Sequence, residues 1–154
     1  MKIAIVAVSR LGRGPEAELV STYVERATAA GRALGLGPVE VIEVESRKPG
    51  KAAEAEALLP HLKDAQVIAC DEHGTALASR AFAADIARLR DQGARKLAFA
   101  IGGADGLDAQ ILNTSARKLA FGPQTWPHAL ARVMLAEQIY RAVTILAGGP
   151  YHRD

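Results

Sequence analysis

Short apolar stretches alternate with segments of helical periodicity along the whole chain, and this alternation limits the possible folds most strongly. The apolar stretches cover residues 2–8, 39–44, 65–71, 96–101 and 119–121, and helical spacing covers residues 16–34, 51–63, 79–92, 108–113 and 128–146. Strands that are apolar without interruption are typical of a parallel sheet covered on both faces. The sequence therefore predicts an α/β fold, mainly a parallel sheet with helices on both faces. The helix that begins at Lys51 is expected to end near Pro60.

The length of 154 residues fits one domain, and no linker or repeat divides it, so we expect a single domain over residues 1–154. The apolar N-terminus looks like a signal peptide, but Ser9-Arg10 interrupts it and no small-residue cleavage site follows, which favours a buried first strand. No apolar run is long enough to cross a membrane, and one cysteine excludes a disulfide framework. We expect a cytoplasmic protein with no membrane partner.

Basic residues gather in the last third of the chain. The formal net charge is only +2, yet residues 109–153 carry one acid, Glu137, against five basic residues: Arg117, Lys118, Arg132, Arg141 and Arg153. A local excess of this kind is either a solvated basic face or a surface for a polyanion such as nucleic acid. On charge alone both interpretations stay open.

The loops that follow the third, fourth and fifth apolar stretches are the predicted ligand site, because ligands of parallel sheets bind where the strands end. These loops are residues 71–74, 102–106 and 121–127. The glycines at 102–106 match neither a dinucleotide-binding nor a P-loop pattern. Cys70 precedes two acids, so we interpret it as a small buried side chain rather than a nucleophile. His73 has no second ligand at metal-binding spacing, and no metal is predicted.

The last helix, residues 128–146, is apolar around most of its circumference. A helix of this kind is buried on more than one side. Either a partner subunit or a central position within one chain would explain it, and we favour a homodimer because a C-terminal helix is usually peripheral. The tail Tyr151-His152-Arg153 is either a disordered end or a functional segment.

Three motifs together resemble one known family. They are Ile101-Gly102-Gly103-x-x-Gly106, Pro127-His128-x-x-x-Arg132-Val133-x-Leu135-x-Glu137-Gln138-x-Tyr140-Arg141-Ala142, and Gly149-Pro150-Tyr151-His152. With these motifs the whole chain resembles the bacterial 23S ribosomal RNA pseudouridine N3-methyltransferases, small members of the SPOUT superfamily. The resemblance implies a C-terminal trefoil knot, S-adenosylmethionine as cofactor and a homodimer packed through the last helix. The implied reaction is methylation of N3 of a pseudouridine in a 23S rRNA stem-loop on assembled ribosomes.

The resemblance also assigns site residues. Those implied to bind the cofactor are Cys70, Gly102, Gly103, Phe121, Gly122, Pro123, Gln124, Thr125 and Trp126. Three tail residues are the catalytic candidates. His152 is the candidate base, Arg153 would bind the anion of the acceptor ring or a phosphate, and Tyr151 completes the group. Residues implied to face RNA or the interface are His128, Arg132, Glu137 and Arg141, with Glu137 pairing one of the two arginines. A non-catalytic module that binds a nucleotide-like ligand, or a ribosome-binding accessory protein, remains the alternative.

Overall fold

The computed structural model describes residues 1–153; Asp154, the last residue of the predicted domain, lies outside the described residues. Five strands form one sheet: β1 (Lys2–Val8), β2 (Val39–Val44), β3 (Gln66–Ala76), β4 (Lys96–Ile101) and β5 (Arg117–Ala120). Their order is β2-β1-β4-β3-β5, and every neighbouring pair is parallel. The parallel α/β sheet predicted from the sequence is therefore confirmed. The trefoil knot stays a prediction.

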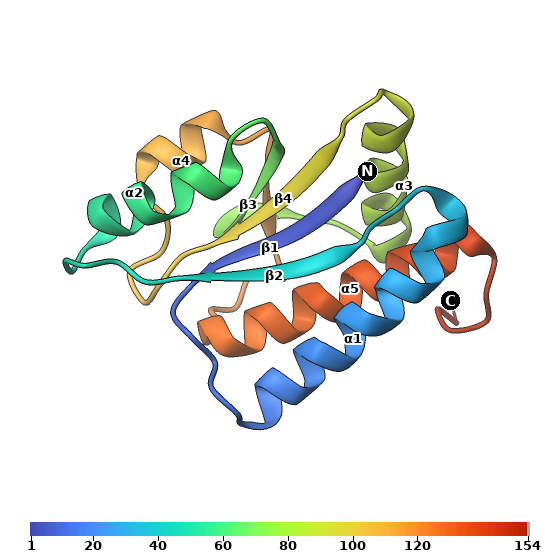
Figure 1. Cartoon of the computed structure of the whole chain (residues 1–154), viewed down its shortest axis with the longest axis horizontal. Helices are drawn as coiled ribbons and strands as arrows, with labels where there is room; N and C mark the ends of the chain where they lie inside the picture. The colour runs from blue at the N-terminus through green and yellow to red at the C-terminus, as the bar shows by residue number, and fades with distance from the viewer. Residues whose placement is uncertain (154) are drawn as a thin grey trace.

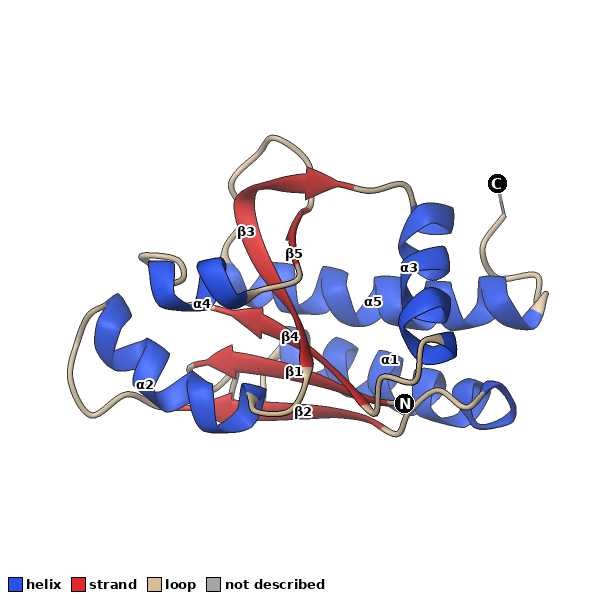
Figure 2. Cartoon of the chain, turned by 90° about the horizontal axis from the view of Figure 1, so that it is seen from above, coloured by secondary structure: helices blue, strands red, loops and turns tan. Residues whose placement is uncertain are grey.

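Helices cover both faces of this sheet. They are α1 (Pro15–Gly31), the 3₁₀ turn η1 (Arg32–Leu34), α2 (Lys51–Leu62), α3 (Ser79–Asp91), α4 (Ala109–Thr114) and α5 (His128–Ala147). Figures 1 and 2 show α1, α3 and α5 on one face and α2 with α4 on the other. Alternate residues of β1 feed the two cores: Ile3 and Ile5 pack toward α1, α3 and α5, whereas Ala4 and Val6 pack toward α2 and α4.

Two predicted boundaries were wrong. The helix α2 continues through Pro60 to Leu62, because a proline in the last turn removes only one intrahelical hydrogen bond. The third strand is longer than residues 65–71 and irregular: Cys70 and Thr75 both pair with Leu119, so the residues between them bulge out of the ladder. This bulge moves part of a predicted ligand loop into β3.

The last helix, α5, lies between α1 and α3 on its face of the sheet and packs against both (Figure 1). Much of its apolar circumference is therefore covered within the chain, which is the central-helix explanation that the sequence left open. Val133 and Met134 remain half-buried, and Leu130 is 41% exposed. Among residues 1–153, no helix is both long and apolar enough to cross a membrane.

Candidate functional site

The three predicted loops meet at the carboxyl edge of the sheet and enclose a cavity of about 420 Å³. It lies within the usual size range of small-molecule sites. The residues that line it are Lys51, Cys70–His73, Ile101–Leu107, Leu112, Leu119–Phe121, Gln124–Trp126, His128 and Ala131. The structure thus brings together most of the residues assigned to the cofactor. Gly122 and Pro123 are not among the lining residues.

Glycines allow the loop after β4, which lines this cavity, to fold tightly. A Cβ on Gly102 would lie 2.5 Å from the carbonyl oxygen of Gly106, and a Cβ on Gly103 would lie 2.5 Å from Glu54 Oε2. Gly102 has no room for a side chain because backbone atoms crowd it, whereas at Gly103 the Glu54 side chain would have to move; Gly106 has a left-handed φ of +80°. The glycines therefore fix the tight path of a loop that lines the cavity.

Two hydrogen bonds order the loop over residues 121–127. The Thr125 hydroxyl donates to Glu72 Oε2 over 2.8 Å and ties this loop to the bulged end of β3. The indole N–H of Trp126 donates to the carbonyl oxygen of Phe121 over 3.1 Å. The Trp126 side chain stays 40% exposed while it lines the cavity. An exposed indole held in one orientation at a cavity mouth is suited to stacking on a planar ligand.

The surroundings of the Cys70 thiol disfavour the thiolate that a nucleophile needs. Burial raises the pKa of this thiol to about 12, so the thiol keeps its proton at neutral pH. The raised pKa agrees with the interpretation that Cys70 is not a nucleophile, while the side chain is only half-buried and lines the cavity.

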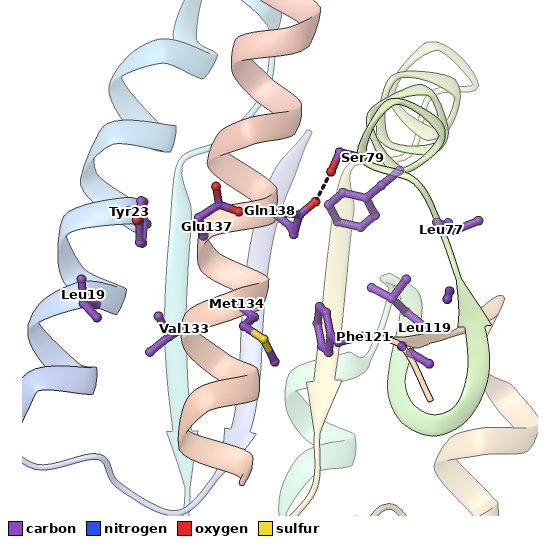
Figure 3. A pocket seen from close by; sticks show the side chains of 14 residues that line it. Leu19, Tyr23, Leu77, Ser79, Leu119, Phe121, Val133, Met134, Glu137 and Gln138 are labelled. Carbon is purple, nitrogen blue, oxygen red and sulfur yellow. Dashed lines mark hydrogen bonds between the residues drawn. The ribbon is translucent and has the colours of Figure 1, made fainter. Parts of the chain in front are cut away.

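A second, more apolar hollow of about 440 Å³ opens between α1, α3 and α5 beside the ends of β3 and β5. Figure 3 shows Leu19 and Tyr23 on α1 facing Val133 on α5, whereas Met134 points from the other side of α5 toward Phe121. At its upper end the Ser79 hydroxyl donates to Gln138 Oε1 over 2.7 Å. Gly122 and Phe121 also line this hollow, so the loop after β5 separates the two cavities.

The predicted catalytic tail is folded onto the far half of α5. Tyr151 donates to Glu137 Oε1 over 3.1 Å, and Arg141 donates to the carbonyl oxygen of His152 over 3.1 Å. The sequence predicts that Glu137 pairs with Arg132 or Arg141, and in the structure its partner is Arg141, at 2.6 Å. Since α5 rises about 1.5 Å per residue, Glu137 lies about 14 Å along the axis from His128 at the first cavity. None of the tail residues lines that cavity.

Arg132 does not face RNA in this chain. Its side chain is fully buried and pairs with Glu43 over 2.7 Å, and it also donates to the carbonyl oxygens of Val8 and Ser9. It fastens α5 to the ends of β1 and β2, so the expectation of a phosphate contact at Arg132 is corrected to an internal anchor. His128, by contrast, lines the first cavity.

Sequence reasoning missed Lys51 at the cavity and Glu43 as the partner of Arg132. Neither stands in a motif, and Glu43 is far from Arg132 in sequence, so no sequence signal pointed to either. Among residues 1–153, no group of three or more His, Cys, Asp or Glu side chains is arranged to hold a metal ion.

Residues 1–152 match the family model described as "Predicted SPOUT methyltransferase". The chain belongs to the SPOUT methyltransferase family. It is 75% identical over its full length to a Phenylobacterium zucineum protein and 67% identical to one from Caulobacter vibrioides, with 100% and 99% of those chains covered. Both relatives are named "Ribosomal RNA large subunit methyltransferase H".

Solved structures agree with the SPOUT assignment at the level of the fold. A probable methyltransferase from Bordetella pertussis superposes with a TM-score of 0.53 at 19% identity, covering 92% of this chain and 96% of that chain. A probable methylase family protein from Haemophilus influenzae also gives 0.53, at 15% identity, covering 99% of this chain and 70% of that chain.

Proposed function

We propose that this SPOUT protein transfers a methyl group from S-adenosylmethionine to N3 of a pseudouridine in a 23S rRNA stem-loop, with the assembled ribosome as substrate. The observation that carries the proposal is full-length identity of 67–75% to relatives named as large-subunit rRNA methyltransferases. The cavity at the carboxyl edge of the sheet supports it, because its loops offer a compact site for a nucleoside-like donor. A protein that acts on ribosomes would work in the cytoplasm.

The donor fits the cavity by its volume and by the chemistry of its lining. Backbone groups of the Gly102–Gly106 loop and of residues 121–126 would hold the adenine and ribose, and Cys70 would contribute packing rather than charge. Bound there, S-adenosylmethionine supplies an electrophilic methyl group on a sulfonium. The protein's own contribution is to orient the acceptor ring against that methyl group and to exclude water.

The N3 proton of the acceptor must leave, and His152 is the proposed base. Tyr151 is a poor candidate, because desolvation and the hydrogen bond to Glu137 raise the pKa of its phenol well above the ordinary value of 10.0. Arg153 would stabilise the ring anion or hold a phosphate. Removal of a positioned general base lowers a rate by about 10²–10⁴-fold, and that is the loss we expect in kcat for His152→Ala.

A homodimer would join the tail to the donor cavity. The tail is fixed to the half of α5 remote from its own cavity, so it would serve the cavity of a second copy. The apolar hollow of Figure 3, with Leu19 46% exposed and Leu130 41% exposed nearby, supplies a surface that a second copy would cover. Light scattering on the purified protein tests the dimer, and a monomer at micromolar concentration would contradict it.

Transfer of a labelled methyl group tests the function directly. Assembled ribosomes, naked 23S rRNA and ribosomes that lack the pseudouridine are compared as acceptors. Label on ribosomes alone, mapped to N3 of one pseudouridine, is the expected result. Donor binding without label on any acceptor would favour a non-catalytic ligand-binding module, and ribosome binding without either would favour an accessory protein.

Mixed dimers test whether the tail works across the interface. One variant lacks residues 151–154, and the other carries Gly102→Val, which fills the donor loop. Each variant alone should be inactive, whereas the mixture should regain part of the activity, because one site of the mixed dimer has both an intact cavity and an intact tail. Activity of the tail-deleted variant at the wild-type level would contradict the assignment of the tail.

A further inference from the structure

The basic excess in the last third of the chain is mostly neutralised by ion pairs. Arg117 pairs with Asp85 over 2.9 Å, Arg132 with Glu43 over 2.7 Å and Arg141 with Glu137 over 2.6 Å. An arginine already bound to a carboxylate has its donors committed and its charge balanced. This leaves Lys118 and Arg153, both exposed, as the basic residues of the segment without an assigned ion pair among the described residues.

Exposed basic side chains gather instead on two loops of the N-terminal half, which we call the basic ridge. The loop after β1 supplies Arg10 and Arg13, and the segment after β2 supplies Arg47, Lys48 and Lys51; all five are exposed. Among these five in the described chain, only Arg10 has an assigned ion pair, to Glu45 over 3.4 Å with both side chains largely exposed.

Direct contacts join the two loops. The Arg10–Glu45 ion pair links the loop after β1 to the segment after β2. Beside this pair, the backbone N–H of Leu11 donates to Oε2 of Glu43, near the end of β2, over 2.8 Å. Within the second loop, the Ser46 hydroxyl bonds to Lys48 and orders the turn. Glu45 is the one acid inside the ridge, and it is balanced by Arg10, so the free charges belong to the other four residues.

The ridge lies beside the donor cavity. Lys51, its last member, lines that cavity. Figure 1 shows both loops at the left end of the molecule, where β1 and β2 end and where α5 begins. A chain of phosphates that crosses the ridge would therefore lead into the mouth of the cavity.

We propose that the basic ridge binds the RNA phosphate backbone next to the methylated nucleotide. The inference rests on the proposed function and adds to it the surface that holds the substrate. Exposed lysine and arginine side chains on loops bind phosphates with little regard to sequence and release counterions as they do so. The ridge fixes the position of the RNA, and the cavity and the tail provide the chemistry.

The test compares two triple variants that lose the same charge. In one, Arg13→Ala, Arg47→Ala and Lys48→Ala remove three of the four free charges of the ridge; Lys51 is kept because it lines the cavity. In the matched control, Lys2→Ala, Lys63→Ala and Arg95→Ala remove three exposed charges around the opposite edge of the sheet. Donor affinity, KM for ribosomes and the salt dependence of RNA binding are measured for both.

The ridge variant should keep its donor affinity and raise KM for the ribosome about 10- to 100-fold. The slope of log K against log salt should become less steep by about 2–3, since each of the three lost phosphate contacts contributes roughly 0.7–0.9. The control should move each quantity less than about twofold. Equal effects in both variants, or an unchanged slope in the ridge variant, would overturn the proposal. If the wild-type protein methylates no RNA, the proposed function fails instead, whichever way the variants bind.

Discussion

The hydroxyl of Tyr151 donates a hydrogen bond of 3.1 Å to Oε1 of Glu137, and this one carboxylate organises the C-terminal tail. The same oxygen accepts from Arg141 over 2.6 Å, and the Arg141 guanidinium lies 4.9 Å from the centre of the Tyr151 ring. Tyr140 completes the cluster, with its ring centre 4.6 Å from the ring centre of Tyr151. The tail is thus an ordered continuation of α5 up to the proposed base, His152.

Replacement of Glu137 by glutamine should loosen the tail without unfolding the protein. Hydrogen bonds to a charged group contribute about 1.5–3 kcal/mol, so amide exchange over residues 149–153 should become about 10- to 100-fold faster. We expect kcat to fall while donor affinity stays unchanged, because Glu137 positions the tail and does not line the donor cavity. Glu25→Gln on the exposed side of α1 is the control. A loss of kcat with unaltered exchange would assign Glu137 another role.

The Tyr151 phenol should titrate above its ordinary pKa of 10.0, because desolvation and the neighbouring Glu137 carboxylate both disfavour the anion. The folded state therefore stabilises the neutral phenol, and this contribution is complete below pH 10 and lost as the pH rises through the raised pKa. Tyrosinate absorbance of the wild-type protein minus that of Tyr151→Phe isolates this residue. A difference that titrates at or below pH 10 would contradict the expectation.

Loss of the Glu43 charge should destabilise the fold more than loss of a surface charge. Glu43→Gln leaves the fully buried Arg132 guanidinium without a counter-charge, and such losses typically cost 3–5 kcal/mol. Because Glu43 is 34% exposed, water softens the effect, and we expect about 3 kcal/mol in urea unfolding. Glu40→Gln, exposed on the same strand, should change the free energy of unfolding by less than about 0.5 kcal/mol. A loss below about 1 kcal/mol at Glu43 would show that the pair is not an anchor.

The strands and helices were predictable because each has its own local signal. The apolar run over Lys96–Ile101 became β4 with the same ends, and Gly102 to Gly106 followed it as a tight loop. The bulge in β3 carried no such signal, because it depends on how Leu119 of another strand pairs with it. Sequence periodicity reports which residues are buried, and it does not report which partner buries them.

The candidate site was predictable in its loops but not in its charges. Counting the basic residues of the last third suggested an RNA surface, since a sequence shows charges without their partners. Asp85 and Glu43, which neutralise Arg117 and Arg132, come from elements distant in sequence. Only the fold reveals that these arginines are used internally, while Arg47 and its neighbours remain exposed.

Trp126 should report donor binding directly, because it is the single tryptophan of the chain and its indole lines the donor cavity. A purine that stacks on an indole quenches its emission, and Trp126 is oriented for this by its hydrogen bond to Phe121. Titration with S-adenosylmethionine should therefore change the emission in a saturable way. The affinity from fluorescence should match the one from equilibrium dialysis.

Gly102→Ala provides the matched loss-of-binding variant for that titration. Its Cβ would lie 2.5 Å from the Gly106 carbonyl oxygen, so the loop must shift and the donor should bind at least about tenfold more weakly. Ala29→Ser, an exposed change on α1 that does not line the cavity, should leave both the emission change and the affinity intact. Saturable quenching that survives in Gly102→Ala at wild-type affinity would mean that the donor binds elsewhere and that the Gly102–Gly106 loop is not part of its site.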